Sequence, residues 1–215
     1  MNDRPVLLSS AYFPPVQYMS LVASAGKVMI EREENYIKQT YRNRFYILSP
    51  NGILSLPVPV LEGSFHKTPI KDIRIDYSKR WQQVHLRGIY SSYRAAPYFE
   101  YLYDKVEKII SHNFTFLLDL NMASLMLLVE FTGIKADISY TENFEPVRKE
   151  GVDLRYFINP KKREMAQIFR YRNYIQVFSD RFPFMPGLST LDLIFNTGPD
   201  AAVFLPEIVL PDYFK

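Results

Sequence analysis

The chain contains no cysteine, and this absence excludes several kinds of chemistry at once. Disulfide bonds, thiolate nucleophiles and zinc sites with cysteine ligands are all impossible. Histidine is also scarce, since the three residues His66, His85 and His112 lie far apart in the sequence and match no recognised metal-ligand spacing. We therefore predict no metal site, and the sequence identifies no cofactor.

A long hydrophobic run is missing as well. No stretch of about 18 or more apolar residues is present, so we expect no membrane-spanning helix. The N-terminal segment has charges at Asp3 and Arg4 and lacks the apolar core of a signal peptide, and we therefore expect a cytoplasmic protein. The sequence does not predict the oligomeric state.

The chain also lacks a strong excess of either charge. Its 26 basic and 23 acidic residues are mixed along the sequence and leave a formal net charge of +3. Proteins that bind nucleic acid usually have a stronger basic patch, so we expect no nucleic-acid partner. The signatures of P-loop nucleotide hydrolysis, Rossmann redox enzymes, zincins and the nucleophile elbow are absent too.

The residues that are present favour a single α/β domain over residues 1–215. With 215 residues, of which 47% are hydrophobic and 15% aromatic, the chain can bury one sizeable core. Near the N-terminus the patterns predict a strand over 6–10, a helix over 16–25 and a second strand over 27–31. Two prolines precede the helix and Gly26 ends it, as is typical of a strand-to-helix-to-strand unit.

The rest of the chain is predicted to form a mixed sheet with a helical middle section of about three helices. Residues 71–76 alternate as in a strand, with Ile73 and Ile75 facing the core. The other expected elements, in order, are a hairpin over 36–48 and 53–58, helices over 78–93, 97–110 and 113–133, a short strand over 136–140 within an irregular connection at 134–165, a strand over 174–178, and a helix capped by Ser189.

The second of these helices has one mainly apolar face, and we expect it to pack in the core. The residues of that face recur at helical spacing and are Tyr98, Tyr101, Leu102, Lys105, Val106 and Ile109. A cofactor-binding role is the less favoured interpretation of this pattern.

Three segments contain candidate functional residues, and the first is the run from Asn35 to Arg44. On an extended chain, Arg42 and Arg44 would project to the same side about 6.6 Å apart, while Asn43 would point to the other face. Two guanidinium groups at this spacing could bind one phosphate or carboxylate. Ordinary surface charge is the alternative.

The second segment is the helix that begins near Trp81. Trp81, His85 and Ile89 share one helical face, whereas Arg87, Tyr90 and Arg94 share another. His85 lies in a dense aromatic and basic setting, where a shifted proton affinity could support general acid or base catalysis. A structural histidine that only makes hydrogen bonds is the alternative.

The third segment runs from Thr190 to Asp200 and is expected to form a short helix, a Gly-Pro turn and a new helix. Asp192, Asn196 and Pro199 lie at helical-neighbour spacing. Free amide groups at the start of the second helix could bind an anion. Capping and packing are the favoured explanation for most of these residues.

Six motifs in order resemble the WbqC-like family over most of the chain. The motifs are Ala11-Tyr12-Phe13-Pro14, Tyr36 to Arg44, Ile73-Arg74-Ile75-Asp76, Trp81 with His85-Leu86-Arg87, Tyr93-Arg94-Ala95-Ala96-Pro97-Tyr98-Phe99, and Leu191 to Pro199. Two departures stand out: Ser10-Ala11 replaces the usual Gln-Pro pair, and Thr40-Tyr41 replaces the usual Ser-Trp. If the family's glutamine contacts substrate, these departures imply a changed specificity.

The family takes its name from genes found among those for bacterial surface polysaccharide assembly. The resemblance therefore implies a bacterial cytoplasmic protein that acts on an activated sugar or an aminoacyl-type donor, and it does not establish the reaction. A group-transfer enzyme is our leading hypothesis, because basic, aromatic and histidine residues occur together in the motifs. The phosphate- or carboxylate-bearing substrate is the part of this expectation that rests on the arginine pair. A non-enzymatic binding or assembly protein is the alternative, and a buried, fully hydrogen-bonded His85 would favour it over the enzyme.

The resemblance also predicts one pocket assembled from the motifs. His85 would be the general acid or base, Asp192 with Asn196 would orient the reacting groups, Arg42 with Arg44 would hold an anion, and the tyrosines would position the substrate. The predicted pocket residues are Tyr12, Tyr36, Lys38, Arg42, Asn43, Arg44, His85, Tyr93, Arg94, Tyr98, Asp192 and Asn196.

Overall fold

The computed structural model describes residues 5–61, 67–146, 151–161 and 169–208. Its centre is a four-stranded parallel sheet in the order β5-β2-β1-β6, which pairs Asp137–Tyr140, Lys27–Glu31, Val6–Ser9 and Val152–Asp153. An antiparallel hairpin of β3 (Arg44–Ser49) and β4 (Gly52–Pro57) lies beside it. A mixed α/β fold with a helical middle section is therefore confirmed.

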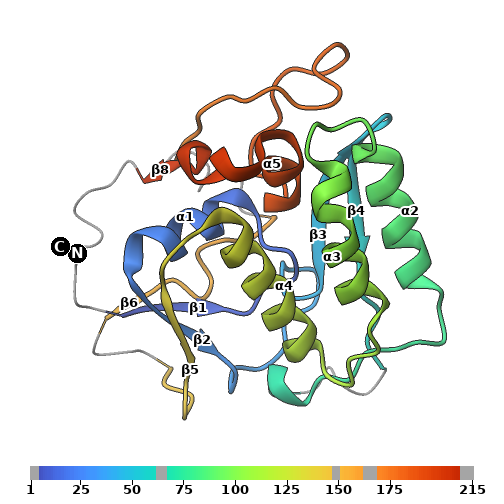
Figure 1. Ribbon diagram of the computed structural model, residues 1–215. Helices are drawn as coiled ribbons and strands as arrows, with labels where there is room; N and C mark the ends of the chain where they lie inside the picture. The colour runs from blue at the N-terminus through green and yellow to red at the C-terminus, as the bar shows by residue number, and fades with distance from the viewer. Residues whose placement is uncertain (1–4, 62–66, 147–150, 162–168, 209–215) are drawn as a thin grey trace.

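The N-terminal part folds as its sequence predicts. Pro15 precedes α1 (Val16–Ala25), and Gly26 ends this helix with a φ of 69°, a conformation that glycine adopts without steric cost. The helix returns the chain so that β2 pairs in parallel with β1, and it packs on both strands (Figure 1). These elements form a β-α-β unit at the middle of the sheet.

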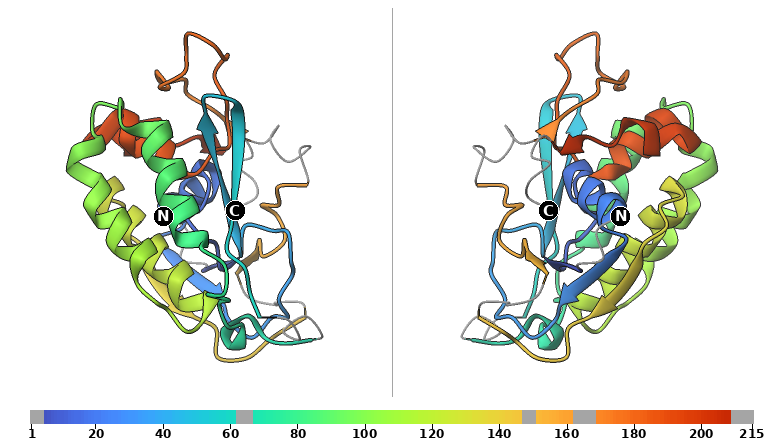
Figure 2. Two further views of the ribbon diagram at one scale, coloured as in Figure 1. Left: turned by 90° about the vertical axis from the view of Figure 1, so that its right-hand side faces the viewer. Right: turned by 90° about the vertical axis from the view of Figure 1, so that its left-hand side faces the viewer.

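Three consecutive helices form a layer on one side of the hairpin, as Figure 2 shows. They are α2 (Trp81–Tyr93), α3 (Phe99–Ser111) and α4 (Leu117–Thr132). The Leu-rich α4 is central, because Leu120 and Leu128 have no exposed surface and the helix contacts α3, α5 and η1 (Ile70–Asp72). The prediction of three helices is confirmed.

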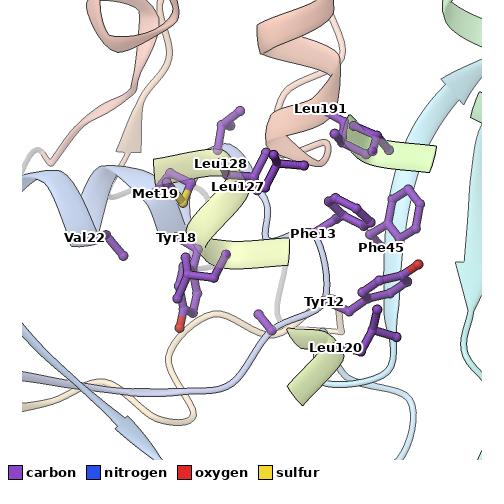
Figure 3. Packing of buried hydrophobic residues seen from close by; sticks show 14 of the residues in the cluster. Tyr12, Phe13, Tyr18, Met19, Val22, Phe45, Leu120, Leu127, Leu128 and Leu191 are labelled. Carbon is purple, nitrogen blue, oxygen red and sulfur yellow. The ribbon is translucent and has the colours of Figure 1, made fainter. Parts of the chain in front are cut away.

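The turn between β1 and α1 is an anchor point of the core. Phe13 has a φ of 39°, an uncommon value for a residue with a side chain. Its backbone N–H donates to Ser124 Oγ of α4 at 3.0 Å, and its carbonyl accepts from Ser189 Oγ at 2.9 Å. The rings of Tyr12, Phe13 and Phe45 pack against one another with centroids 4.9 to 5.3 Å apart (Figure 3). Contacts on all sides therefore hold this strained turn.

The C-terminal part contains α5 (Thr190–Thr197), the 3-10 helix η3 (Gly198–Phe204) and the short strand β8 (Glu207–Ile208), which pairs with β7 (Phe169–Arg170). Ser189 caps α5 as predicted, since its Oγ accepts from the Leu191 N–H at 3.3 Å. Helix α5 packs against α1, α3 and α4.

Three details of the sequence prediction are wrong. Residues 71–76 contain η1 and isolated bridges in place of a strand, although Ile73 and Ile75 are buried as expected. Residues 174–178 lie in a long loop without a strand. The connection after β5 includes β6, which joins the central sheet through only two residues.

The expected inward face of α3 is also partly wrong. The structure buries Phe99, Val106 and Ile110 and leaves Tyr101 78% exposed. Lys105 is exposed as well. The buried side is therefore rotated relative to the predicted one, and part of the apolar side of α3 faces outward.

Candidate functional site

The parallel sheet has a topological switch point between β1 and β6. From β1 the chain passes through α1 to β2 on one side, whereas β6 lies on the other side of β1. In open parallel sheets, ligands bind in the crevice outside the carboxyl ends of the strands at this point. In this sheet, that position follows Ser9, Glu31 and Asp153, the last residues of β1, β2 and β6.

Arg155 joins the ends of β2 and β6. Its Nη1 lies 3.0 Å from Glu31 Oε2, and its Nε lies 3.0 Å from Asp153 Oδ1. The hydrogen bond with Asp153 raises the pKa of this guanidinium above its usual range. Arg155 and Glu31 are both almost completely buried, so the pair places opposite charges in a position that water barely reaches.

Arg42 forms a second buried ion pair at the end of β1. Its Nε and Nη2 donate to the two oxygens of Glu34 at 2.8 and 2.7 Å, which is the bidentate geometry that arginine and carboxylate favour. Nη2 also donates to Ser9 Oγ. Asn121 of α4 donates to the Arg42 carbonyl at 2.8 Å and thereby fixes the backbone there.

A small cavity lies between these two groups. Its volume is about 10 Å³, enough for roughly one water molecule. Tyr156 stands beside it with 44% of its surface exposed, and its ring centroid is 5.7 Å from the Arg42 guanidinium carbon and 5.8 Å from that of Arg155. The lining residues are Leu8, Ser9, Ser10, Ala11, Tyr18, Tyr41, Arg42, Leu154, Arg155 and Ile158. We call the residues Ser9, Glu31, Glu34, Arg42, Asp153, Arg155 and Tyr156 the sheet-end cluster.

Arg44 and Tyr36 lie close to this cluster. Burial raises the pKa of the Tyr36 phenol to about 12. The positive charges of Arg44 and Arg42 oppose that rise. The Nε of Arg44 is buried and has no hydrogen-bond acceptor among the described residues. Arg44 Nε is therefore a buried donor without an acceptor in the described ranges, whereas the Arg42 guanidinium is paired with Glu34.

Asn43 and Lys38 have different surroundings. Asn43 is buried, and its Nδ2 donates to the carbonyl of Val58 at 3.2 Å, so it supports the backbone at the start of the hairpin. Lys38 is exposed.

His85 lies in the core beside Tyr12, apart from the sheet-end cavity. Its Nε2 is 3.1 Å from the Pro57 carbonyl, which can only accept, so Nε2 bears the hydrogen and Nδ1 accepts from the Tyr12 hydroxyl at 3.2 Å. Burial lowers the pKa of His85 to about 4 and keeps the ring neutral near pH 7. This geometry favours the structural alternative, which we expected of a non-enzymatic protein.

Asp192 forms another separate group. Its carboxylate is completely buried and accepts from Tyr93 Oη at 2.8 Å, Tyr174 Oη at 2.6 Å and Gln176 Nε2 at 2.8 Å. Burial raises the pKa of Asp192, and these three hydrogen bonds oppose that rise. Tyr174 and Gln176 belong to the loop over 171–188, which projects beyond α5 in Figure 1. The carboxylate therefore ties this loop to α5 and α2.

The remaining predicted residues lie near that group or on the surface. Asn196 Nδ2 donates to the Asp192 carbonyl at 2.7 Å, one turn earlier in α5. Arg94 is exposed at the C-terminal end of α2. Tyr98 packs on Gly198 at the edge of a surface hollow. The structure thus distributes the predicted residues over the sheet end, the core and the helical layer.

Sequence reasoning missed most of the sheet-end cluster. Ser9, Glu31, Glu34, Asp153, Arg155 and Tyr156 were not among the candidates. The available signal was weak, because Asp153 and Arg155 lie in a segment without a sustained pattern and β6 spans only two residues. Polar residues directly after each parallel strand could have indicated the cluster, had β6 been recognised.

Neither a membrane helix nor a metal site emerges from the residues that the structure describes. None of the helices in these ranges is long and apolar enough to cross a membrane. In the same ranges, no group of three or more His, Asp or Glu side chains is placed to hold a metal ion. His66 lies outside the described residues.

Comparison with known proteins gives one family and one uncharacterised relative. The chain is 26% identical over 229 residues to "Uncharacterized protein Rv1507c" of Mycobacterium tuberculosis (strain ATCC 25618 / H37Rv), an alignment that covers 94% of this chain and 97% of that protein. No solved structure matches. The pattern of the WbqC-like protein family matches residues 9–158, a range that begins at Ser9 and includes the whole sheet-end cluster. With most of its length matched, the chain belongs to the WbqC-like protein family.

Proposed function

We propose that this protein is a group-transfer enzyme that binds a phosphate- or carboxylate-bearing substrate at the carboxyl ends of β1 and β6. The observation that supports this most is the position of the sheet-end cluster at the switch point of a parallel sheet, where such folds bind small molecules. We further propose a role in bacterial surface polysaccharide or envelope metabolism, with the enzyme in the cytoplasm.

The chemistry of the cluster suits the binding and orientation of a substrate. Glu34 and Glu31 hold Arg42 and Arg155 in fixed orientations, so the walls of the cavity are in place before a ligand binds. Ser9 and Ser10 line the cavity with hydroxyl groups, and Tyr156 adds a half-exposed ring. Arg44 is the proposed anion donor because its Nε lacks an acceptor among the described residues.

The catalytic roles of His85 and Asp192 stay predictions. Both groups are buried and hydrogen-bonded away from the sheet-end cavity, so the present geometry supports a structural contribution from each. The alternative function, a non-enzymatic binding or assembly protein, gains support from the buried His85.

A thermal-shift screen tests the proposed function. Nucleotide-sugars, aminoacyl donors and simple phosphates would be added to the wild type, to Arg44→Gln and to Arg87→Gln, which changes an exposed arginine on α2. A ligand that binds only the folded state at about 100 times its Kd adds about 2.7 kcal/mol of stability and raises the Tm. We expect a ligand whose shift persists in Arg87→Gln and is lost in Arg44→Gln.

Two outcomes would count against this proposal. A wild type that shifts with none of these ligands removes the support for a substrate site and favours the binding or assembly function. A shift that is equal in all three proteins places the anion away from Arg44 and contradicts the proposed position.

A further inference from the structure

Two adjoining surface hollows lie along the outward side of α3 and α4. The first has a volume of about 450 Å³ and is lined by Tyr98, Tyr101, Leu102, Glu130, Phe131 and the Gly198-Pro199 turn. The second has a volume of about 430 Å³ and shares Glu130 with the first; its other lining residues are Ile109 of α3 and Ala123, Met126, Leu127 and Val129 of α4. We call the two hollows together the α3–α4 groove.

The groove presents apolar side chains that the core does not use. Tyr101 is 78% exposed and Met126 is 49% exposed, although both belong to mainly apolar helix faces. Leu102 and Ile109, two further apolar residues of the predicted face of α3, are only partly buried. Exposed apolar surface beside a hollow is typical of an interaction site.

The wall of the first hollow is fixed in place. The Tyr98 ring lies directly on Gly198, where a Cβ atom would be 2.4 Å from the ring. The Tyr98 N–H also donates to the Phe195 carbonyl at 3.0 Å. Tyr98 is thus held from both sides, and the hollow exists before any partner arrives.

Charges of both signs lie in the middle of the groove. Lys105 Nζ is 2.6 Å from Glu130 Oε1 and 5.2 Å from the centroid of the Phe131 ring. Both side chains of the ion pair are at least half exposed. A two-fold contact between two copies of this patch would place the lysine of one copy opposite the glutamate of the other.

We propose that the α3–α4 groove binds a second copy of this chain in a symmetric dimer. Tyr101 of each copy inserts into the first hollow of the other, and Lys105 of each copy lies opposite Glu130 of the other. A two-fold contact uses the same patch on both copies, which is what this combination of a projecting ring, a hollow and paired charges supplies. Tyrosine is also among the residues that contribute most to protein interfaces.

Sedimentation velocity over a range of protein concentrations tests the dimer. For the 25.3 kDa chain we expect a reversible monomer-to-dimer transition between about 1 and about 200 μM. Tyr101→Ser should weaken self-association at least tenfold, because it removes the inserted ring. Ile175→Ser is the matched control, since it removes an 82% exposed apolar side chain from the loop over 171–188 and leaves the groove intact.

A charge reversal distinguishes a self-complementary contact from other partners. Glu130→Lys places two lysines opposite one another in the dimer and should weaken it, whereas Lys105→Glu combined with Glu130→Lys restores opposite charges and should recover most of the affinity. Circular dichroism of each variant checks that the fold is unchanged.

Three results would overturn the proposal. A protein that sediments as a monomer at every concentration contradicts the proposed dimer. A dimer that Tyr101→Ser leaves unchanged assigns the contact to another surface. A monomer that binds the apolar dye 1-anilinonaphthalene-8-sulfonate through Tyr101 identifies the groove as a small-molecule site instead.

Discussion

The sheet-end cluster and the α3–α4 groove each contain a short ion pair, and the two pairs have almost the same length. Arg42 Nη2 lies 2.7 Å from Glu34, and Lys105 Nζ lies 2.6 Å from Glu130. The side chains of the first pair are 5% and 0% exposed, whereas those of the second are 50% and 61% exposed. Burial removes the water that would otherwise stabilise a lone charge, so only the first pair has members that depend on each other.

The largest effect should come from breaking the buried pair. Arg42→Leu leaves the Glu34 carboxylate buried without its cation, and we expect a loss of about 3–5 kcal/mol in the free energy of unfolding, measured with urea. Arg42→Leu combined with Glu34→Leu should recover most of that loss because no charge remains. Arg87→Leu, at an exposed position on α2, is the control, and a single-variant loss below about 1 kcal/mol would contradict the argument.

His85 sharpens the comparison, because its protonation would create a buried charge with no ion-pair partner. Its pKa is about 4 in the folded chain against 6.5 for an unperturbed histidine, so the unfolded chain binds more protons between these two pH values. Neutral His85 therefore contributes its full share to the free energy of unfolding above pH 6.5. As the pH falls from 6.5 to about 4, the free energy of unfolding decreases by roughly 3 kcal/mol.

Urea unfolding at a series of pH values measures that contribution. His85→Gln should flatten the dependence on pH within the window, whereas His112→Gln, which changes an exposed histidine, should keep the wild-type slope. Equal slopes in all three proteins would show that His85 keeps an ordinary pKa in the folded chain.

Asp192 provides an intermediate case, a buried carboxylate that depends on hydrogen bonds. Tyr93→Phe removes one donor and keeps the ring, and we expect a loss of about 1.5–3 kcal/mol in chemical denaturation. Tyr174→Phe should act similarly through the other oxygen. Tyr90→Phe changes an exposed tyrosine and should cost almost nothing. A Tyr93→Phe protein as stable as wild type would mean that the carboxylate finds another donor.

The smallest effect should come from the exposed pair. Lys105→Met should change the stability of the monomer by at most about 1 kcal/mol, and added salt should reduce even that difference. The measurement belongs at low protein concentration, where self-association does not contribute. A loss as large as that of Arg42→Leu would contradict the view that burial decides the contribution.

The sequence predicts the local elements of this fold well and its long-range contacts poorly. Hydrophobic period and end signals locate α1, α2, α3 and α4, since these depend on neighbouring residues. The alternation of apolar and polar residues over 71–76 correctly predicts that Ile73 and Ile75 are buried. A strand also needs a neighbouring strand with which to form continuous hydrogen bonds, and here only isolated bridges form. The apolar face of α3 fails for a related reason, because the side that is buried depends on where α5 and α2 pack.

The candidate site is less predictable than the fold. Glu31 and Arg155 are 124 positions apart, and nothing local in either segment indicates that they meet. The motifs that resemble the family include Arg42 and Tyr36 at the sheet end, but they also include Tyr12, His85 and Asp192, which the structure gives buried hydrogen bonds. A motif therefore identifies residues under constraint without separating a core role from a substrate role.

The order of strands has a consequence for the folding of the newly made chain. The inner strands β1 and β2 come first, but their outer partners β6 and β5 follow only at residues 152–153 and 137–140. Until the chain has been synthesised that far, both edges of the β-α-β unit lack their neighbours, and Glu31 lacks Arg155. Contacts between such distant residues slow folding and expose strand edges in the meantime. The central sheet, on which the candidate site depends, can therefore be completed only after the middle of the chain has been synthesised.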